Sequence, residues 1–121
     1  MKYLVILVVH DIEKLEDVVA GWRSAGVGGA TILPSLGLAS LDKKRALLED
    51  MPLMPLMDAI FEDDEELNRT LFTIIDGKET LDKVVEVTQN ILGDLDSPNN
   101  GVMAILPVEA AYGVRKRTDM E

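Results

Sequence analysis

The feature that most constrains this chain is a pattern that occurs twice along it. Residues Leu15–Val19 repeat the order of apolar and charged residues found at Leu81–Val85, and each half ends in Ile-Leu-Pro, at 32–34 and 105–107. In each half, the helical pattern lies between two strand-like segments. Two β-α-β units joined in one chain form the ferredoxin-like βαββαβ arrangement. We therefore predict an α+β fold, with one antiparallel sheet and both helices on one of its faces.

Hydrophobic periodicity places the individual elements. One helix is expected to follow Asp11 and to end at Gly26, and the other to run through Leu81–Leu92 and to end at Gly93. The expected strands are Tyr3–Val9, Ala30–Pro34, Thr70–Ile75 and Val102–Val108. The first strand is apolar throughout, which predicts a central strand that is buried on both faces. Pro107, near the end of the last strand, predicts an edge strand or a position at the rim of the sheet, because proline cannot donate to a neighbouring strand.

Two helices on one face leave the other face of such a sheet without cover from its own chain. The composition is 47% apolar and only 4% aromatic, so the core must be aliphatic. A small domain this rich in aliphatic residues often hides part of its surface in an oligomer. We expect a dimer or a trimer.

The two halves are separated by residues 37–67, about thirty residues where about five are usual. Ser40 can cap a helix over Leu41–Asp50, and Pro55 can begin a further turn through Phe61. Three methionines, Met51, Met54 and Met57, lie between these segments and within the second. Methionine adapts to varied partners, so these side chains either contact a partner protein or form part of a permanent core.

Composition and charge exclude several classes of site. The chain has no cysteine, one histidine (His10) and a net charge of −10, which argues against disulfides, thiolate zinc sites, histidine metal centres and nucleic-acid binding. Residues 94–101 have acids and amides at alternate positions, but no bidentate glutamate follows at EF-hand spacing, so no metal site is predicted. The uncharged stretch 24–41 contains glycines and a proline, which argues against a membrane span. We expect a cytoplasmic protein with a single domain over residues 1–121, whose last residues, 113–121, form a tail.

Four stretches together resemble the motifs of one known family. Gly26–Ile32 is similar to its Gly-x-x-Gly-x-Thr-Val approach to the second strand, and Gly37 matches the glycine at the base of its long T-loop. Asn100–Glu109 is similar to its Asp-Gly-Lys-Ile-Phe-Val-x-Pro-Val-Glu, and Arg115–Thr118 to its Arg-Ile-Arg-Thr. This is the PII signal-transduction family, whose members regulate nitrogen metabolism. The resemblance implies a homotrimer and makes residues 37–67 the counterpart of the T-loop.

The resemblance also implies a ligand site. The family binds ATP or ADP in clefts between subunits, so Thr31 and Gly37 correspond to adenine-side contacts, and the adjacent Leu38 is a further candidate for ligand binding. Asn100, Gly101 and Val102 correspond to the end of the family's B-loop, and Arg115 and Arg117 to phosphate contacts from the neighbouring chain. Ser97 and Val102 stand where the family has lysines that bind phosphate. Weak binding of ATP is therefore expected, with AMP, ADP or another small anion less affected.

The expected function is a non-enzymatic regulator that senses a nucleotide or anion and acts through residues 37–67 on a transporter or an enzyme. One alternative is a small ferredoxin-like enzyme. An acyl-phosphate hydrolase on this scaffold would need an arginine-asparagine phosphate cradle near the first strand, which Val8–Asp11 does not provide. No pairing of nucleophile and base is recognisable, so no catalytic residue is predicted. The other alternative is a structural oligomer without a ligand.

Overall fold

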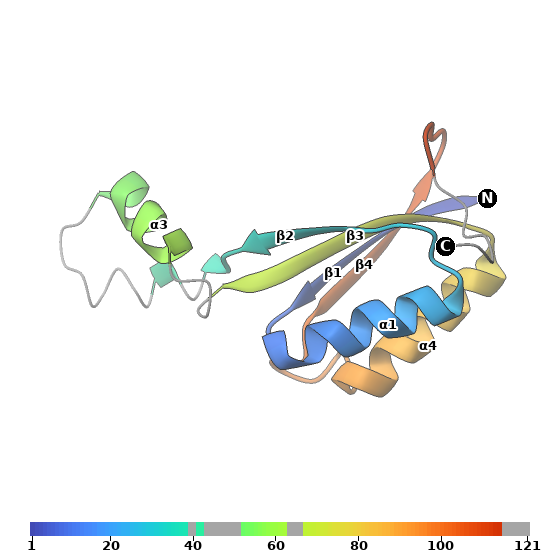
Figure 1. Cartoon of the computed structure of the whole chain (residues 1–121), viewed down its shortest axis with the longest axis horizontal. Helices are drawn as coiled ribbons and strands as arrows, with labels where there is room; N and C mark the ends of the chain where they lie inside the picture. The colour runs from blue at the N-terminus through green and yellow to red at the C-terminus, as the bar shows by residue number, and fades with distance from the viewer. Residues whose placement is uncertain (39–40, 43–51, 63–66, 115–121) are drawn as a thin grey trace.

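Four antiparallel strands form one sheet in the order β2-β3-β1-β4. The structure, a computed structural model, describes residues 1–38, 41–42, 52–62 and 67–114. The strands are β1 (Lys2–Val9), β2 (Thr31–Ser35), β3 (Asn68–Asp76) and β4 (Val102–Val108). Both main helices lie on one face of this sheet, as Figure 1 shows. The predicted ferredoxin-like α+β fold is confirmed.

The strand predictions are correct in kind, with small shifts in their ends. The bounds of β4 are those predicted, β1 begins one residue earlier, and β3 extends the predicted strand at both ends. β2 begins at Thr31 instead of Ala30. Just before it, the backbone carbonyl of Gly29 accepts a hydrogen bond from the Thr73 hydroxyl of β3. β1 is central and β4 lies at an edge, as its Pro107 predicted.

The two main helices end at the predicted glycines, Gly26 and Gly93, whereas the second helix begins three residues before the predicted Leu81. After the short 3-10 turn η1 (Ile12–Lys14), α1 spans Leu15–Ala25, and α4 spans Lys78–Leu92. The Asp11 carboxylate accepts the backbone N–H of Glu13 at 3.0 Å, which caps the first turn. Gly26 ends α1 with a φ of 108°, a conformation that favours glycine.

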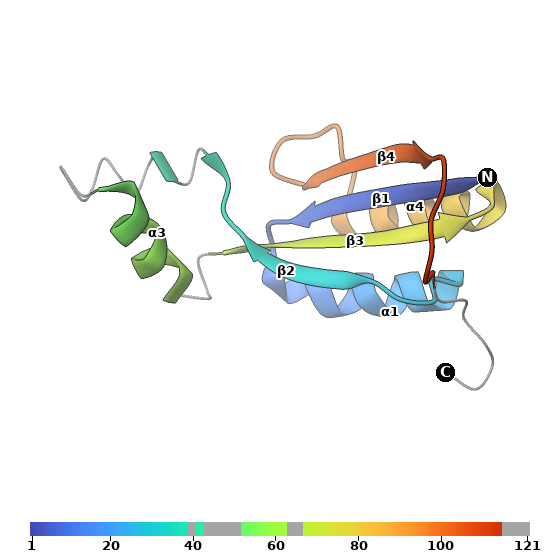
Figure 2. The same cartoon turned by 90° about the horizontal axis from the view of Figure 1, so that it is seen from above.

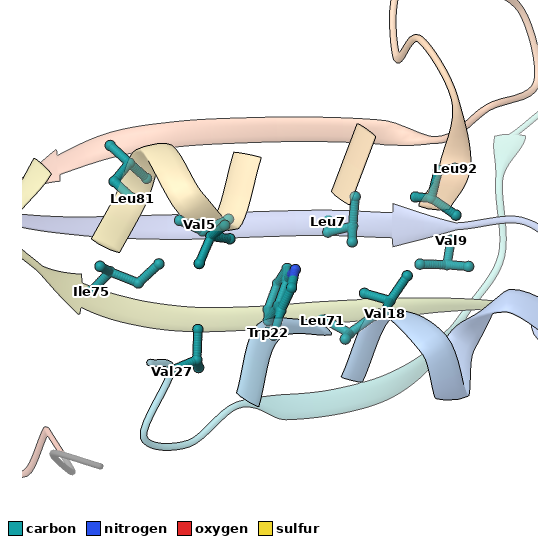
Figure 3. Close-up of a cluster of buried hydrophobic side chains, with 11 residues drawn as sticks. Val5, Leu7, Val9, Val18, Trp22, Val27, Leu71, Ile75, Leu81 and Leu92 are labelled. Atoms are coloured by element: carbon teal, nitrogen blue, oxygen red, sulfur yellow. The ribbon is translucent and has the colours of Figure 1, made fainter. Parts of the chain in front are cut away.

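The hydrophobic core lies between the sheet and these two helices. The side chains buried there come from the sheet and from both helices: Val5, Leu7, Val9, Leu71 and Ile75 from strands, Val18 and Trp22 from α1, and Leu81, Val84 and Leu92 from α4. Figure 3 shows Trp22 in the middle of this cluster. Its indole N–H donates to the Thr88 hydroxyl at 2.9 Å, and that hydroxyl donates to the Val84 carbonyl at 2.6 Å. The indole N–H, the only polar group of the Trp22 side chain, therefore has a hydrogen-bond acceptor inside an aliphatic core.

Thr88→Val is expected to lower the free energy of unfolding by about 1–3 kcal/mol, because it leaves the buried indole N–H without an acceptor. Chemical denaturation of the two proteins at one protein concentration measures the difference. In a Trp22→Phe background the same change should cost much less, since no N–H remains to be satisfied. An equal cost in both backgrounds would show that the hydrogen bond contributes nothing to stability.

A further helix, α3 (Leu53–Glu62), extends beyond the end of the sheet (Figures 1 and 2). It begins before the predicted start at Pro55, which lies in its first turn, where a missing N–H costs no helical hydrogen bond. Leu56 is fully buried against Leu67, with Leu36 and Leu41 packed around them. The N–H of Leu41 donates to the Gly37 carbonyl at 3.0 Å, but most of the predicted helix 41–50 lies outside the described residues.

Candidate ligand site and partner-contacting segment

The face of the sheet opposite the helices carries apolar side chains with no cover from the described part of the chain. Ile6 pairs with Phe72 on one side and with Ala104 on the other, so these three side chains share one face. Val5, Leu7 and Val9 point to the helices and are fully buried, whereas the other side chains of β1 are only partly buried. The expectation that β1 is buried on both faces is therefore met on the helix side alone. We call this second surface the open face.

The open face continues across all four strands. By the strand register it includes the apolar residues Leu4, Ile6, Val8, Leu33, Phe72, Ile74, Val102, Ala104 and Leu106. Phe72 is 37% exposed and Leu106 is 44% exposed. An apolar surface that spans a whole sheet is typical of an interaction site.

The candidate ligand residues that the structure describes lie at two edges of the sheet. Thr31 begins β2 and pairs with Phe72, near the middle of β3. Gly37 and the exposed Leu38 follow the far end of β2, whereas Asn100, Gly101 and Val102 lead into β4 on the opposite edge. Gly37 and Gly101 are thus at the same end of the sheet but at opposite edges. The edge strands β2 and β4 are about three strand spacings, or roughly 14 Å, apart.

Gly101 is the most tightly constrained of these residues. Its φ is 113°, and a Cβ at this position would lie 2.7 Å from the backbone oxygen of Val8. The preceding loop is held by its own polar groups, because Asn100 donates through Nδ2 to the Asp94 carbonyl at 2.8 Å. The Asp94 carboxylate accepts the N–H of Asp96 at 3.0 Å. No group of three or more metal-ligating side chains occurs among the residues that the structure describes.

A hollow of about 370 Å³ lies beside Gly101 and Val102. Gln89 and Asp96 supply its polar side chains, and no lysine or arginine is among the described residues that line it. An amide and a carboxylate offer a phosphate group little attraction compared with basic side chains.

A second cavity, of about 620 Å³, lies at the other end of the sheet. The cavity is lined by Lys2, Gly26–Gly28, Asp76 and the segment Ala111–Val114. Figure 2 shows that segment crossing the end of the sheet from β4 toward α1. Arg115 and Arg117 follow in sequence and lie outside the described residues.

The sequence analysis missed the participation of Lys2 and Asp76 in this cavity. The Lys2 ammonium lies 4.0 Å from the Asp76 carboxylate, which is also 3.9 Å from the N-terminal amino group. The only signal in the sequence is one charged residue at the outer end of each of two apolar strands. Their pairing follows from the antiparallel register of β1 and β3.

A single chain does not bring all the candidate ligand residues together. The start of β4, at Val102, and its end, at Val108, are separated by about 20 Å of extended strand. The B-loop-like residues Asn100–Val102 therefore lie at one end of the sheet, and the segment that leads to Arg115 lies at the other. Within one chain, a small ligand beside Asn100–Val102 does not reach the described segment Ala111–Val114.

Comparisons with known proteins identify the fold. No family model matches the chain, and no curated protein matches its sequence. Among solved structures, the ATP complex of Bacillus subtilis GlnK, a PII-family protein, superposes with a TM-score of 0.53 at 17% identity, covering 87% of this chain and 79% of GlnK. The fold is PII-like. A second B. subtilis GlnK structure gives a TM-score of 0.51 at 11% identity, covering 89% of this chain and 85% of that one.

Within this PII-like fold, α3 belongs to the long connection between β2 and β3. Met54 on α3 is 67% exposed and Met57 is partly buried, whereas Met51 lies outside the described residues. The side chain that anchors α3 is Leu56, which the methionine pattern did not identify. No helix within the described ranges is both long enough and apolar enough to cross a membrane.

Proposed function

We propose that this protein is a cytoplasmic, non-enzymatic regulator of the PII type. It forms a homotrimer, senses a small nucleotide or anion in clefts between subunits, and acts through residues 37–67 on a partner protein. The observation that carries the proposal is a PII-like fold that combines an apolar open face with a connection extending past the end of the sheet. The similarity to GlnK extends the proposal to the control of nitrogen metabolism.

The trimer is supported by the open face. Its apolar side chains are exposed in one chain, and burying them between copies would be favourable by roughly 25 cal/mol for each Å² removed from water. Assembly through this face leaves both helices on the outside of the particle, where their charged sides meet water.

The placement of ligands between subunits is supported by the separation of the candidate residues. Asn100–Val102 and the segment before Arg115 lie at opposite ends of one sheet. A neighbouring copy that places its C-terminal segment beside the first copy's Gly101 would bring a basic side chain to a hollow that has none among its described lining residues. The arginines would then supply the positive charge that a phosphate requires.

The expected ligands are AMP, ADP or another small anion, with ATP bound weakly. Ser97→Lys is expected to tighten ATP binding about ten- to hundredfold, since one charge-assisted hydrogen bond contributes roughly 1.5–3 kcal/mol. Calorimetric titration of the trimer with AMP, ADP and ATP measures this. Ser97→Gln, which has a long side chain without charge, serves as the control and should leave ATP affinity unchanged.

Two results of the same titrations would contradict the proposal. Submicromolar, magnesium-dependent binding of ATP by the unmodified chain would show that the missing lysines do not matter. Absence of binding for every nucleotide and anion tested would favour the alternative of a structural oligomer without a ligand.

A further inference from the structure

The helix α3 presents an apolar surface that the described part of the chain leaves exposed. Leu56 anchors the helix to Leu67, whereas Leu53 is 40%, Met54 67% and Phe61 37% exposed. In Figures 1 and 2, α3 stands clear of the sheet and of helices α1 and α4. It therefore has one attached side and one exposed side.

The exposed side has a definite pattern. At about 100° per residue, Leu53, Met57, Phe61 and Met54 follow one another around the helix within an arc of roughly 100°. Asp58 and Glu62 come next on the same side, and Leu56 lies on the other side of the arc. A strip of four apolar side chains is thus bordered along one edge by two exposed carboxylates.

The charge on this helix identifies the kind of partner that fits it. The helix contains no lysine, arginine or histidine, and Glu62 is followed in sequence by four more acidic residues. Surfaces of anionic lipid attract helices with basic polar faces and repel acidic ones. A protein groove with an apolar floor and lysine or arginine along one rim complements both parts of the pattern.

We infer that α3 is a docking helix whose strip of Leu53, Met54, Met57 and Phe61 enters an apolar groove of a partner protein, with Asp58 and Glu62 against basic residues on its rim. This deepens the proposed function and rests on it, because it names the contact that residues 37–67 make. The helix is already formed in the free chain. A ten-residue helix is marginal by itself, and the Leu56 anchor removes part of the ordering cost on binding.

The first step of the test identifies the contact. Two variants of the full chain are expressed in its native cells, each with one photo-crosslinking residue. One variant carries it at Met54, and the control variant carries it at Asn90, an exposed position on α4. A discrete protein adduct from Met54 that Asn90 does not give is expected. The inference would be overturned if Met54 crosslinked only to lipid or only to another copy of this chain. It would also be overturned if both positions gave the same adduct, or if Met54 gave none.

The second step measures affinity with the purified crosslinked protein. Asp58→Lys with Glu62→Lys is expected to weaken binding at least about tenfold and to flatten its dependence on salt. Asp82→Lys with Glu86→Lys reverses two exposed carboxylates at the same spacing on α4 and should leave affinity within about twofold. Equal effects of the two pairs would overturn the assignment of the basic rim.

The apolar strip is tested with Met54→Ser and Phe61→Ser together, which should weaken binding at least about thirtyfold, as loss of a central anchor does. Unchanged affinity would overturn the inference. Binding of the unmodified chain to vesicles of phosphatidylcholine and phosphatidylserine would do so as well. Nucleotide titration and light scattering on the same variants should be unchanged. A failure of docking is thereby distinguished from a failure of the proposed regulator as a whole.

Discussion

Phe72→Asp is expected to convert the proposed trimer into monomers. Phe72 lies on the open face, in register with Ile6 and Thr31, and is 37% exposed in one chain. If this face is buried between copies, each carboxylate would be placed among apolar side chains without a partner, which costs several kcal/mol per ion. At micromolar concentration, the mass measured by light scattering should be about 40 kDa for the unmodified protein and the 13.3 kDa of one chain for the variant.

The monomer formed by this variant should still be folded. Phe72 points away from the helices, whereas its neighbours Leu71 and Thr73 are buried on the helix side. Asn90→Asp adds the same charge on the exposed surface of α4 and should leave the trimer intact. A monomer from the unmodified chain would refute the trimer, and a Phe72→Asp protein that stays trimeric would show that the open face is not the interface.

Gly101→Ala is expected to lower the free energy of unfolding by about 2–4 kcal/mol. A φ of 113° strains any residue with a Cβ, and the added carbon would lie 2.7 Å from the Val8 backbone oxygen. Neither β1 nor the start of β4 can move without breaking their pairing. Denaturant unfolding at one fixed protein concentration measures the loss, since the stability of an oligomer depends on concentration.

Gly29→Ala is the matched control for this prediction. Apart from Gly29 and its two chain neighbours, no heavy atom lies within 4 Å of the position that its Cβ would occupy, and its φ is outside the positive range. The change should therefore alter stability by no more than about 0.5 kcal/mol. Equal losses at Gly29 and Gly101 would contradict the argument from geometry.

The main elements of the fold could be predicted because their signals are local. The apolar run at the start of the chain, the helical spacing around Trp22 and the proline in the last strand each depend on a few neighbouring residues. The predicted start of α3 at Pro55 is two residues late, because the first turn of a helix tolerates proline at its third position as well as at its first.

The candidate site could be predicted only in part, because its parts are distant in sequence. Sequence similarity suggested Gly37 and Gly101, but only the strand order shows that they lie on opposite edges at one end of the sheet. The methionines drew attention to the 51–57 stretch, yet Leu56 is the anchor. Which side of a short helix packs depends on the residues that surround it, here Leu36, Leu41 and Leu67, and these come from separate parts of the chain.

Both edge strands of the sheet contain a proline, Pro34 in β2 and Pro107 in β4. Each edge therefore has a position without a backbone N–H for a strand of another copy that approaches from the side. Side-by-side growth of a sheet has no natural end, whereas association through a face is complete once that face is covered. The two prolines thus favour a particle of fixed size over a filament, even at protein concentrations that promote fibre formation.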